Sequence, residues 1–383
     1  MVQLWCFYTG AEFFYFRFAI RSLPHYIITG KNFIKNFKET YMLFSILTPC
    51  YNSAAFIEST VNSFLSQNFT DGELILLNDG SSDNTLEVLT ELAQRDPRIR
   101  VIDQKNSGVS ISRNHLMDEA KGEWILFLDH DDQFLPDAAT ELRRLITAFP
   151  DAECFVFPCC LKDENGGIRE NIAPAFRDFG DQLFTGAEAF RRLYSEKKYR
   201  GQHWQPWRFV FRRECRPHFT TGVIHEDLDA LPFYIAGLHS VCIAKTPYYL
   251  YTMDSPNAVT RSFSPKRVAD ICEVTARLYE KMEKMSSNQS KLQLPDEVIR
   301  GFKAMLAFNI FGYYQAAALF PEPQRSQQLA FFESRKEWLL AIENPSFNSS
   351  LKILCLRVLG VKRAARFFLR INNIRNFLKR FSR

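Results

Sequence analysis

The sequence lacks two glycine-rich signatures that are common in nucleotide-binding α/β proteins. No GxGxxG follows the predicted first strand at residues 43–48, and no GxxxxGK[ST] occurs in the 383 residues. The first pattern holds a dinucleotide pyrophosphate, and the second holds nucleotide phosphates at the start of a helix. Their absence excludes the dinucleotide fingerprint and the P-loop as ways for this chain to bind a nucleotide.

Cysteines with metal-binding or redox spacing are also missing. The nine cysteines are an odd number, and they contain no CxxC pair and no zinc-like set. Secreted disulfide scaffolds use even, regularly spaced cysteines, whereas free thiols persist in reducing compartments. We therefore expect reduced thiols and a cytoplasmic protein.

The N-terminal residues carry no good export or membrane signal. The segment from Leu4 to Ile20 is aromatic, but Glu12 and Arg17 interrupt it, and no small-residue cleavage site follows. A spanning helix needs about 20 mostly apolar residues, and a signal peptide needs a basic segment before its apolar run. We expect residues 1–41 to be a dispensable N-terminal extension, because Met42 stands directly before the first predicted strand.

The centre of the chain lacks the basic excess of a nucleic-acid-binding protein. The net charge is +5, but residues 351–383 hold ten Lys or Arg and no acid. Residues 1–41 hold five basic residues and two acids, which leaves 33 basic and 41 acidic side chains in residues 42–350. A negatively charged body repels phosphate backbones, so no nucleic-acid partner is expected.

Strand and helix patterns alternate from residue 43 to residue 149. Short apolar runs predict strands, and apolar residues at helical spacing predict the helices between them. Strands are predicted at 43–48, 73–77, 99–102 and 125–128, with helices at 54–67, 85–95, 107–122 and 137–149. This alternation is typical of a parallel, doubly wound sheet, in which the loops at the carboxyl edge reach one ligand.

An acidic cluster follows the last of these strands. Asp129, Asp131 and Asp132 come directly after the apolar run 125–128. Neighbouring carboxylates repel one another, and a divalent cation with oxygen ligands relieves that repulsion. Asp129 and Asp131 are therefore candidate ligands of Mn²⁺ or Mg²⁺, although a solvated acidic turn would give the same pattern.

Four short motifs follow the predicted strands in a fixed order: TPCYN at 48–52, NDGSSDNT at 78–85, SGVSISRN at 107–114 and FLDHDD at 127–132. Together they resemble the motifs of the family 2 glycosyltransferases. The resemblance implies the A-type (Rossmann-like) fold, a three-layer α/β domain with a mainly parallel central sheet, here followed by a helical C-terminal region. It also implies transfer of a sugar from a nucleotide donor.

The resemblance assigns the donor contacts to residues at the strand ends. Tyr51 would stack on a uracil ring and Asp79 would accept the ring N–H, which favours a UDP-sugar. Arg113 would contact the base or a phosphate, as its planar set of donors permits. Asp129 would hold the ribose and metal-bound water, and Asp131 would ligate the cation that bridges the diphosphate. The other predicted nucleotide-sugar contacts are Pro49, Asn52, Ser81 and His130.

The second half of the domain is predicted to hold the acceptor. The aromatic, basic segment 201–213 offers Trp204 and Trp207 as sugar platforms, but core packing of Trp207 is at least as good an interpretation. In the family a Glu-Asp pair supplies the catalytic base. Glu226-Asp227 matches it within residues 224–229, which are predicted to start a helix that continues over 231–238. Asp227 is the predicted base and Glu226 an acceptor contact, although helix capping would also explain a carboxylate there.

Three positions depart from the family pattern. Leu116 replaces a common Gly, His130 replaces a small residue, and Thr252 stands where Arg or His usually contacts the leaving diphosphate. Arg261 or Lys245 are the candidates to make that contact instead. Metal ligation by His130 is the less favoured interpretation of a variable position.

Helical spacing dominates from residue 265 onward. Helices are predicted at 268–285, 296–319 and 324–342, before a basic tail with apolar residues at helical intervals. Such a tail is typical of peripheral binding to a membrane surface, here the inner face of the cell membrane, and a packed helix with a solvated basic face is the alternative. The predicted parts are an extension (1–41), a nucleotide-sugar half (42–150), an acceptor half (151–262), a helical region (263–348) and a tail (349–383).

The predicted function is metal-dependent, inverting transfer of a sugar from a UDP-sugar to a hydroxyl of a saccharide or lipid-linked acceptor. By resemblance, the setting is bacterial surface polysaccharide or lipopolysaccharide synthesis. The second hypothesis is a sugar-nucleotide-binding partner without turnover in a polysaccharide assembly. It predicts loss of an acid from the metal or base motif, whereas Asp129, Asp131 and Asp227 are all present. A sugar-1-phosphate nucleotidyltransferase would need a glycine-rich signature that TPCYN lacks.

Overall fold

The computed structural model describes residues 42–199, 201–253, 264–286, 292–340 and 354–367. All the described residues belong to one compact unit, Met42–Arg383. The expected N-terminal extension lies outside the described residues, as do the outer parts of the basic tail.

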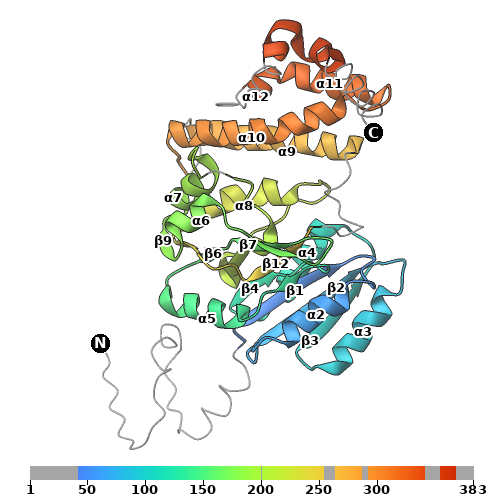
Figure 1. Ribbon diagram of the computed structural model, residues 1–383, viewed down its shortest axis with the longest axis vertical. Helices are drawn as coiled ribbons and strands as arrows, with labels where there is room; N and C mark the ends of the chain where they lie inside the picture. Colours follow the sequence, from blue (N-terminus) through green and yellow to red (C-terminus); the bar gives the residue numbers. More distant parts are fainter. Residues whose placement is uncertain (1–41, 200, 254–263, 287–291, 341–353, 368–383) are drawn as a thin grey trace, which may run out of the picture. The chain divides into compact units, whose positions relative to one another are not determined.

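An eight-stranded sheet forms the centre of this unit, in the order β3-β2-β1-β4-β10-β6-β11-β9 (Figure 1). Its first four strands are parallel: β1 (Phe44–Cys50), β2 (Gly72–Asp79), β3 (Ile99–Gln104) and β4 (Trp124–Phe127). β2 and β4 are buried along their whole length, which explains why their sequences are apolar runs rather than alternating patterns. The predicted parallel sheet is confirmed.

Helices connect these parallel strands: α2 (Ile57–Leu65), α3 (Thr85–Arg95), α4 (Val109–Glu119) and, after β4, α5 (Ala138–Ala148). The bounds of α3 are those predicted, and the other three helices are shorter than predicted at both ends. Each connection returns the chain to the same edge of the sheet. The loops after β1, β2 and β4 therefore leave from one edge, where α/β proteins bind their ligands.

The strand that joins the two halves of the sheet was not predicted. β10 (Phe209–Arg212) lies between β4 and β6 (Cys154–Val156) and runs antiparallel to both. The aromatic segment before it forms a 3-10 turn, η2 (Pro206–Arg208). β11 (Val241–Ile243) is parallel to β6, and β9 (Gln182–Phe184) closes the edge antiparallel to β11. The sheet is thus mainly, but not wholly, parallel.

A second, smaller sheet has the order β5-β12-β7-β8. Its strands are β5 (Gln133–Phe134), β12 (Tyr249–Thr252), β7 (Cys159–Lys162) and β8 (Ile168–Asn171). β7 and β8 form an antiparallel hairpin around the polar residues 163–167. Because β5 directly follows the acidic motif, its pairing with β12 brings a distant part of the chain beside that motif.

The helices between the strands of the second half are short, apart from α8 (Glu226–Gly237). The helix predicted to start within 224–229 and to continue over 231–238 is confirmed, because α8 begins at Glu226 and ends at Gly237, with Pro232 in its interior. Three acids in the first turn favour this start, since they lie at the positive end of the helix dipole. The others are α6 (Pro174–Phe179), α7 (Gly186–Phe190), the π-helix η1 (Arg191–Ser195) and the 3-10 turn η3 (Arg213–Cys215).

The C-terminal region is helical, as predicted. It contains α9 (Pro265–Ser286), α10 (Asp296–Ala317), α11 (Gln324–Ser334) and α12 (Lys336–Leu340), and residues 354–367 are also helical. The single helix predicted at 324–342 is wrong, because the backbone leaves the helical conformation at Arg335. α9 packs against α8 and α10, and α10 packs against η1, so this region contacts the second half of the α/β body directly.

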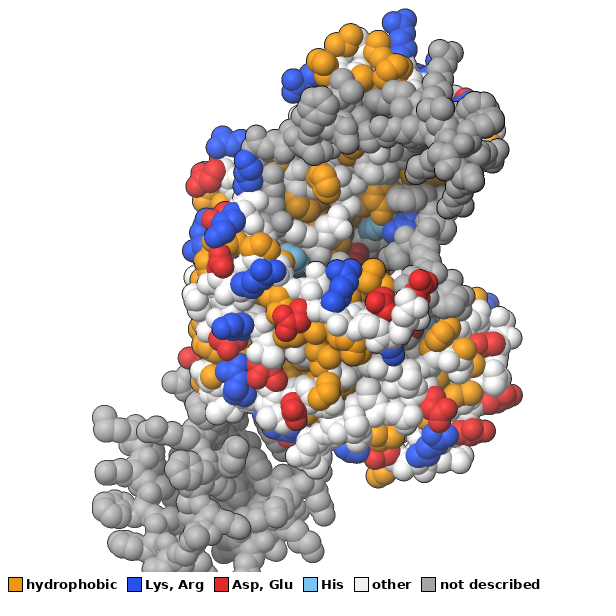
Figure 2. All heavy atoms as spheres, viewed as in Figure 1, with side chains coloured by type: hydrophobic (Ala, Val, Ile, Leu, Met, Phe, Trp, Pro, Cys, Tyr) orange, Lys and Arg blue, Asp and Glu red, His pale blue; other side chains and the backbone are white. Residues whose placement is uncertain are grey.

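Apolar side chains and charged side chains of both signs lie on the face of the molecule drawn in Figure 2. On the face drawn in Figure 2, acidic and basic side chains are interspersed over the α/β body rather than gathered by charge. Within the described ranges, no helix has both the length and the apolar character needed to cross a membrane.

Candidate active site

The loops after β1 and β2 are fastened to each other. Pro49 lies within β1, which ends at Cys50, and two residues after that end the Asn52 N–H donates to Ser81 Oγ at 3.0 Å. Asn52 Oδ1 accepts from the Ser82 N–H at 2.9 Å. Asn52 has a φ of +50°, which Asn adopts more readily than most residues. The turn leaves Tyr51 49% exposed, so a planar ring can reach it.

Asp79 ends β2, and its carboxylate accepts three hydrogen bonds. Oδ1 accepts from the Ser107 N–H and from Gln104 Nε2, both at 2.8 Å, and Oδ2 accepts from the Gly108 N–H at 2.9 Å. Two of these donors are backbone groups at the start of α4, so Asp79 caps that helix from a neighbouring strand. A carboxylate has about four acceptor positions, so Oδ2 has capacity for one further donor.

The acidic motif forms the turn between β4 and β5. The side chains of Asp129 and Asp131 are 26% and 18% exposed, so both are mostly buried but within reach of a ligand. Burial and the nearby Asp131 raise the pKa of Asp129 above its ordinary value, and Arg113 opposes that rise. His130 places its Nδ1 4.0 Å from Asp131 Oδ1. This is the crowding of carboxylates that a bound divalent cation would relieve.

The two predicted metal ligands would not hold a cation alone. Among the described residues, no three His, Cys, Asp or Glu side chains are grouped to hold a metal ion. Mg²⁺ in phosphate-transferring sites is commonly bound by one or two carboxylates, with substrate phosphates and water completing its shell. Asp129 and Asp131 fit a cation whose remaining ligands would be water and the phosphates of a bound substrate.

The third acid of the motif has a structural role that the sequence did not reveal. Asp132 is buried, and its carboxylate accepts from Tyr249 Oη and from the Thr252 N–H, each at 2.7 Å. Tyr249 Oη in turn accepts from the Asp129 N–H at 3.1 Å. Thr60 Oγ1, on α2, lies within hydrogen-bond distance of the carbonyls of His130 and Asp132. β12 and α2 therefore fix the backbone of the turn that carries Asp129 and Asp131.

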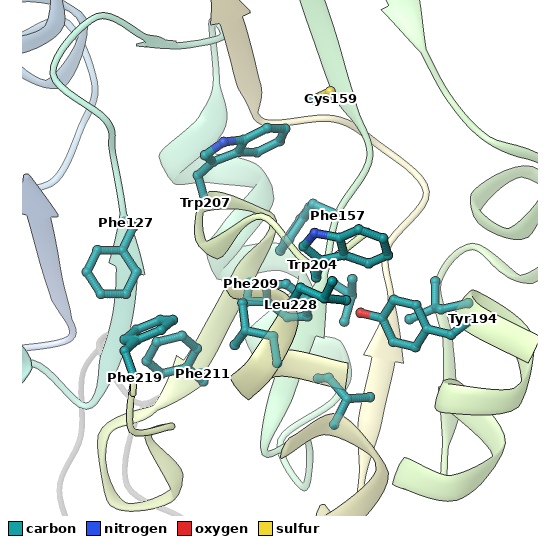
Figure 3. Packing of buried hydrophobic residues seen from close by; sticks show 14 of the residues in the cluster. Phe127, Phe157, Cys159, Tyr194, Trp204, Trp207, Phe209, Phe211, Phe219 and Leu228 are labelled. Atoms are coloured by element: carbon teal, nitrogen blue, oxygen red, sulfur yellow. The ribbon is translucent and has the colours of Figure 1, made fainter. Parts of the chain in front are cut away.

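Arg113, on α4, connects this turn to α8. Its guanidinium carbon lies 5.7 Å from the ring centroids of both Phe127 and Phe219, which are 5.9 Å from each other. Figure 3 shows these two rings at one side of the core. Nη1 is hydrogen-bonded to Glu226, and Nη2 lies 3.7 Å from Asp129 Oδ1. Burial alone would lower the pKa of Arg113, but nearby acids raise it above its ordinary value. Arg113, which was predicted to contact the nucleotide base or a phosphate, thus forms a buried bridge between Asp129 and Glu226 in this structure.

Asp227 lies in the first turn of α8, next to this bridge. Its Oδ1 accepts from the Leu228 N–H at 2.8 Å. Burial, with a further contribution from Glu226, raises the pKa of Asp227 to about 7. The Glu226 carboxylate accepts a hydrogen bond from Arg113 Nη1. Asp227 can therefore gain and lose a proton near neutral pH.

The two predicted acceptor tryptophans lie in the core rather than in an open pocket. Trp204 is 6% exposed and Trp207 4% exposed (Figure 3). The Trp207 ring is stacked on Tyr249 at a centroid distance of 4.5 Å, and Arg208 lies 4.7 Å from the Trp207 ring. Core packing is thus the role of Trp207 in this structure, and it supports Tyr249 behind the acidic turn. The prediction that Trp204 and Trp207 offer open platforms for a sugar is corrected, because both side chains are buried by other parts of the chain.

Of the two candidates for contact with a leaving diphosphate, Lys245 and Arg261, Lys245 alone is among the described residues. Lys245 follows β11, where its backbone N–H donates to Asp181 Oδ1 at 2.9 Å beside the edge strand β9. Thr252 offers its backbone N–H to Asp132. Arg261 lies outside the described residues.

Comparison with known proteins gives a family match over this region. Residues 45–213 match the family model described as glycosyl transferase family 2. The chain is 33% identical over 172 residues to an uncharacterized glycosyltransferase, EpsJ, of Bacillus subtilis, covering 45% of this chain and 48% of that protein. It is 29% identical over 160 residues to a GalNAc(5)-diNAcBac-PP-undecaprenol beta-1,3-glucosyltransferase of Campylobacter jejuni, covering 41% and 49%. The chain thus spans about half the length of these relatives.

Solved structures with a similar fold cover more of the chain. The S. aureus protein TarS, residues 1–349, matches with a TM-score of 0.57 and 17% identity over 85% of this chain and 89% of that chain. The same TarS segment in complex with UDP-GlcNAc matches with a TM-score of 0.55 and 15% identity. At this identity the likeness concerns the fold alone. It extends beyond residue 213, where the family match ends.

Proposed function

We propose that this chain, which belongs to glycosyl transferase family 2 through residues 45–213, transfers a sugar from a UDP-sugar to a hydroxyl of a saccharide or lipid-linked acceptor with inversion. One observation carries the proposal. A carboxyl whose pKa lies near 7, Asp227, is adjacent to Glu226, which is bridged through Arg113 to the acidic turn. A base and a diphosphate-binding turn are thereby held in one rigid arrangement, which a single-displacement reaction requires.

The donor would bind along the carboxyl edge of the sheet. Tyr51 is exposed at the β1 loop and would stack on uracil, while Asp79 Oδ2 would accept the ring N–H. The diphosphate would then lie at the turn of Asp129 and Asp131. A divalent cation bound there would offset the negative charge that grows on the leaving diphosphate.

Asp227 would act as general base. Its carboxylate would take the proton from the acceptor hydroxyl while that oxygen forms a bond to the anomeric carbon and the bond to the diphosphate breaks. The reacting sugar resembles an oxocarbenium ion at this point, as in glycoside hydrolysis. With one base and no enzyme nucleophile, attack comes from the face opposite the leaving group, so an α-linked donor gives a β-linked product.

The proposal is tested by incubating the full chain with a panel of UDP-sugars, Mn²⁺ and candidate acceptors. We expect release of UDP from one donor, strongly increased by one acceptor and accompanied by a β-linked product. A chain that binds UDP but releases none from any donor and acceptor pair would contradict the proposed turnover.

We also propose that the C-terminal helical segment 354–367 binds an anionic membrane surface. Its inward face packs on the body through Val361, whose carbonyl accepts from Tyr314 Oη at 2.9 Å. Its outward face combines cations with apolar side chains, among them Val358, which is 72% exposed. The exposed residues are Leu354, Arg357, Val358, Leu359, Lys362, Arg363, Arg366 and Phe367. Cations beside exposed apolar groups suit the interface of an anionic bilayer.

Flotation with vesicles tests this membrane proposal. Each basic residue near an anionic surface contributes about 1 kcal/mol, so Lys362→Glu, Arg363→Glu and Arg366→Glu together should weaken partitioning by about 100-fold or more. The unchanged chain with neutral vesicles is the control. Equal flotation of the variant and the unchanged chain with anionic vesicles would contradict the proposal.

A further inference from the structure

The segment that leads into α8 has an unusual backbone. Gly222 has a φ of +83°, and His225, the residue before α8, has a φ of +78°. A residue with a Cβ disfavours that conformation, so surrounding contacts must hold His225 there. The next two residues along the chain are Glu226 and Asp227. The direction in which α8 begins, and with it the position of Asp227, depends on this segment.

α9 holds this segment at two backbone groups. Asp270, which is buried, accepts from the Ile224 N–H at 2.8 Å through Oδ2. Lys266, one turn earlier on α9, donates to the same Oδ2 at 2.7 Å and lies 3.4 Å from the Gly222 carbonyl oxygen. Residues four apart on a helix face the same side, so this pair binds one N–H and one C=O of the segment together.

α9 makes a second contact with this part of the chain, farther along α9, through the carboxylate of Asp229 on α8. Asp229, in the first turn of α8, is buried and accepts from Thr220 Oγ1 at 2.6 Å. Arg277 and Lys281, both on α9, approach its carboxylate to 3.3 Å and 3.4 Å. The segment from Thr220 to His225 is therefore tied to α8 at its beginning and to α9 at its middle.

We propose that Asp270 and Lys266 of α9 are positioning residues for Asp227, which makes the C-terminal helical region part of the catalytic apparatus. The inference rests on the proposed function, in which Asp227 is the base. α9 lies outside residues 45–213, so the family match does not include this contact. Asp270 does not touch the reacting groups, and its effect passes through the backbone of Gly222 and Ile224 to the start of α8.

The pH profile distinguishes positioning from a direct charge effect. The groups that act on the pKa of Asp227 include Glu226 on α8 and Arg113 on α4. Tyr313 on α10 and Tyr194 on η1 also lie within electrostatic range of Asp227. Arg267 and Asp270 act on the pKa of His225, the residue before α8. Asp270→Asn removes the same charge as Asp270→Ala, so a shift of the acid limb that occurs in the Ala variant alone would report a change in the burial of Asp227.

The test compares kcat, donor KM, UDP affinity and the pH profile of three variants with those of the unchanged full chain. Asp270→Ala removes the acceptor, Asp270→Asn keeps an oxygen for the Ile224 N–H, and Lys266→Met removes the contact with Gly222. Glu283→Ala is the matched control, because Glu283 is an exposed acid on the same helix.

We expect Asp270→Ala to lower kcat by about 10- to 100-fold, as a small misplacement of a catalytic group does, with donor KM within about threefold. Its acid limb should move to lower pH, because a loosened segment admits water to Asp227. The kcat of Asp270→Asn should stay within about threefold of that of the unchanged chain. Lys266→Met should lower kcat by about 3- to 10-fold and move the acid limb in the same direction as Asp270→Ala. The Lys266 side chain is largely exposed, so its loss leaves the core intact.

Two results would overturn the inference. One is that Lys266→Met and Asp270→Ala both have the same kcat and the same pH profile as the control variant Glu283→Ala. The other is Asp270→Asn losing as much kcat as Asp270→Ala. If Asp227→Asn abolishes turnover while both α9 variants behave as the control, positioning by α9 fails and the proposed base stands. If Asp227→Asn keeps full turnover, the base assignment itself fails.

Discussion

Asp227→Asn is expected to lower kcat by about 10²- to 10⁴-fold, the range over which general acid–base catalysis contributes. Asn keeps the shape of Asp and can still accept from the Leu228 N–H, but it cannot take a proton from the acceptor hydroxyl. Donor binding should remain, because Asp227 contacts neither the Tyr51 loop nor the acidic turn in the proposed arrangement. Measured kcat with unchanged UDP affinity checks the prediction.

The same carboxyl should set the pH dependence of the unchanged chain. Burial and Glu226 raise the pKa of Asp227 to about 7, so below that pH the group is protonated and cannot act as a base. The rate should fall about tenfold per pH unit below the pKa and level off above it. Asp296→Asn, which changes an exposed first-turn acid of α10, is the control. Unchanged kcat in Asp227→Asn would reject the assignment of the base.

Asp131→Asn is expected to lower turnover by about 100-fold or more, because a cation at a developing negative charge contributes several kcal/mol. Asn removes a charged oxygen ligand while leaving the size of the side chain unchanged. A chelator should lower the activity of the unchanged chain in the same way, and added Mn²⁺ should restore it. The rate of UDP release as a function of Mn²⁺ concentration measures both effects.

A nearby acid provides the matched control for this substitution. Asp137 is exposed, six residues farther along the chain, and its φ of +63° is one that Asn adopts readily. Asp137→Asn should therefore keep both the rate and its dependence on Mn²⁺. Equal rates for Asp131→Asn and Asp137→Asn at all Mn²⁺ concentrations would contradict a metal role for Asp131.

The sequence predicted those parts of the fold that are set by local patterns. Apolar runs ending in polar motifs identified β1 to β4, because parallel strands are buried on both faces and their loops leave at one edge. The bounds of α3 were predicted to the residue, since its apolar spacing ends at Asp96-Pro97. The motif loops carry Tyr51, Asp79 and the acidic turn to one edge of the sheet for the same reason.

The sequence could not predict contacts between residues far apart in the chain. Arg113 and Glu226 are separated by 113 residues, and Tyr249 and Asp132 by 117. Trp207 looked like a sugar platform because its neighbours are basic and aromatic, yet its faces are covered by residues from β12. No periodicity reports which distant strand folds over a ring. β10 was missed because it lies within the aromatic and basic segment 201–213, whose composition favoured a binding segment over a strand.

The measurement that tests the account most directly is calorimetric titration of UDP into the unchanged chain and into Asp131→Ala, each with and without Mn²⁺. If carboxylates beyond β4 hold a cation against the diphosphate, UDP should bind the unchanged chain much more tightly when Mn²⁺ is present. Asp131→Ala should lose most of that gain. Equal UDP affinity in all four titrations would contradict the account.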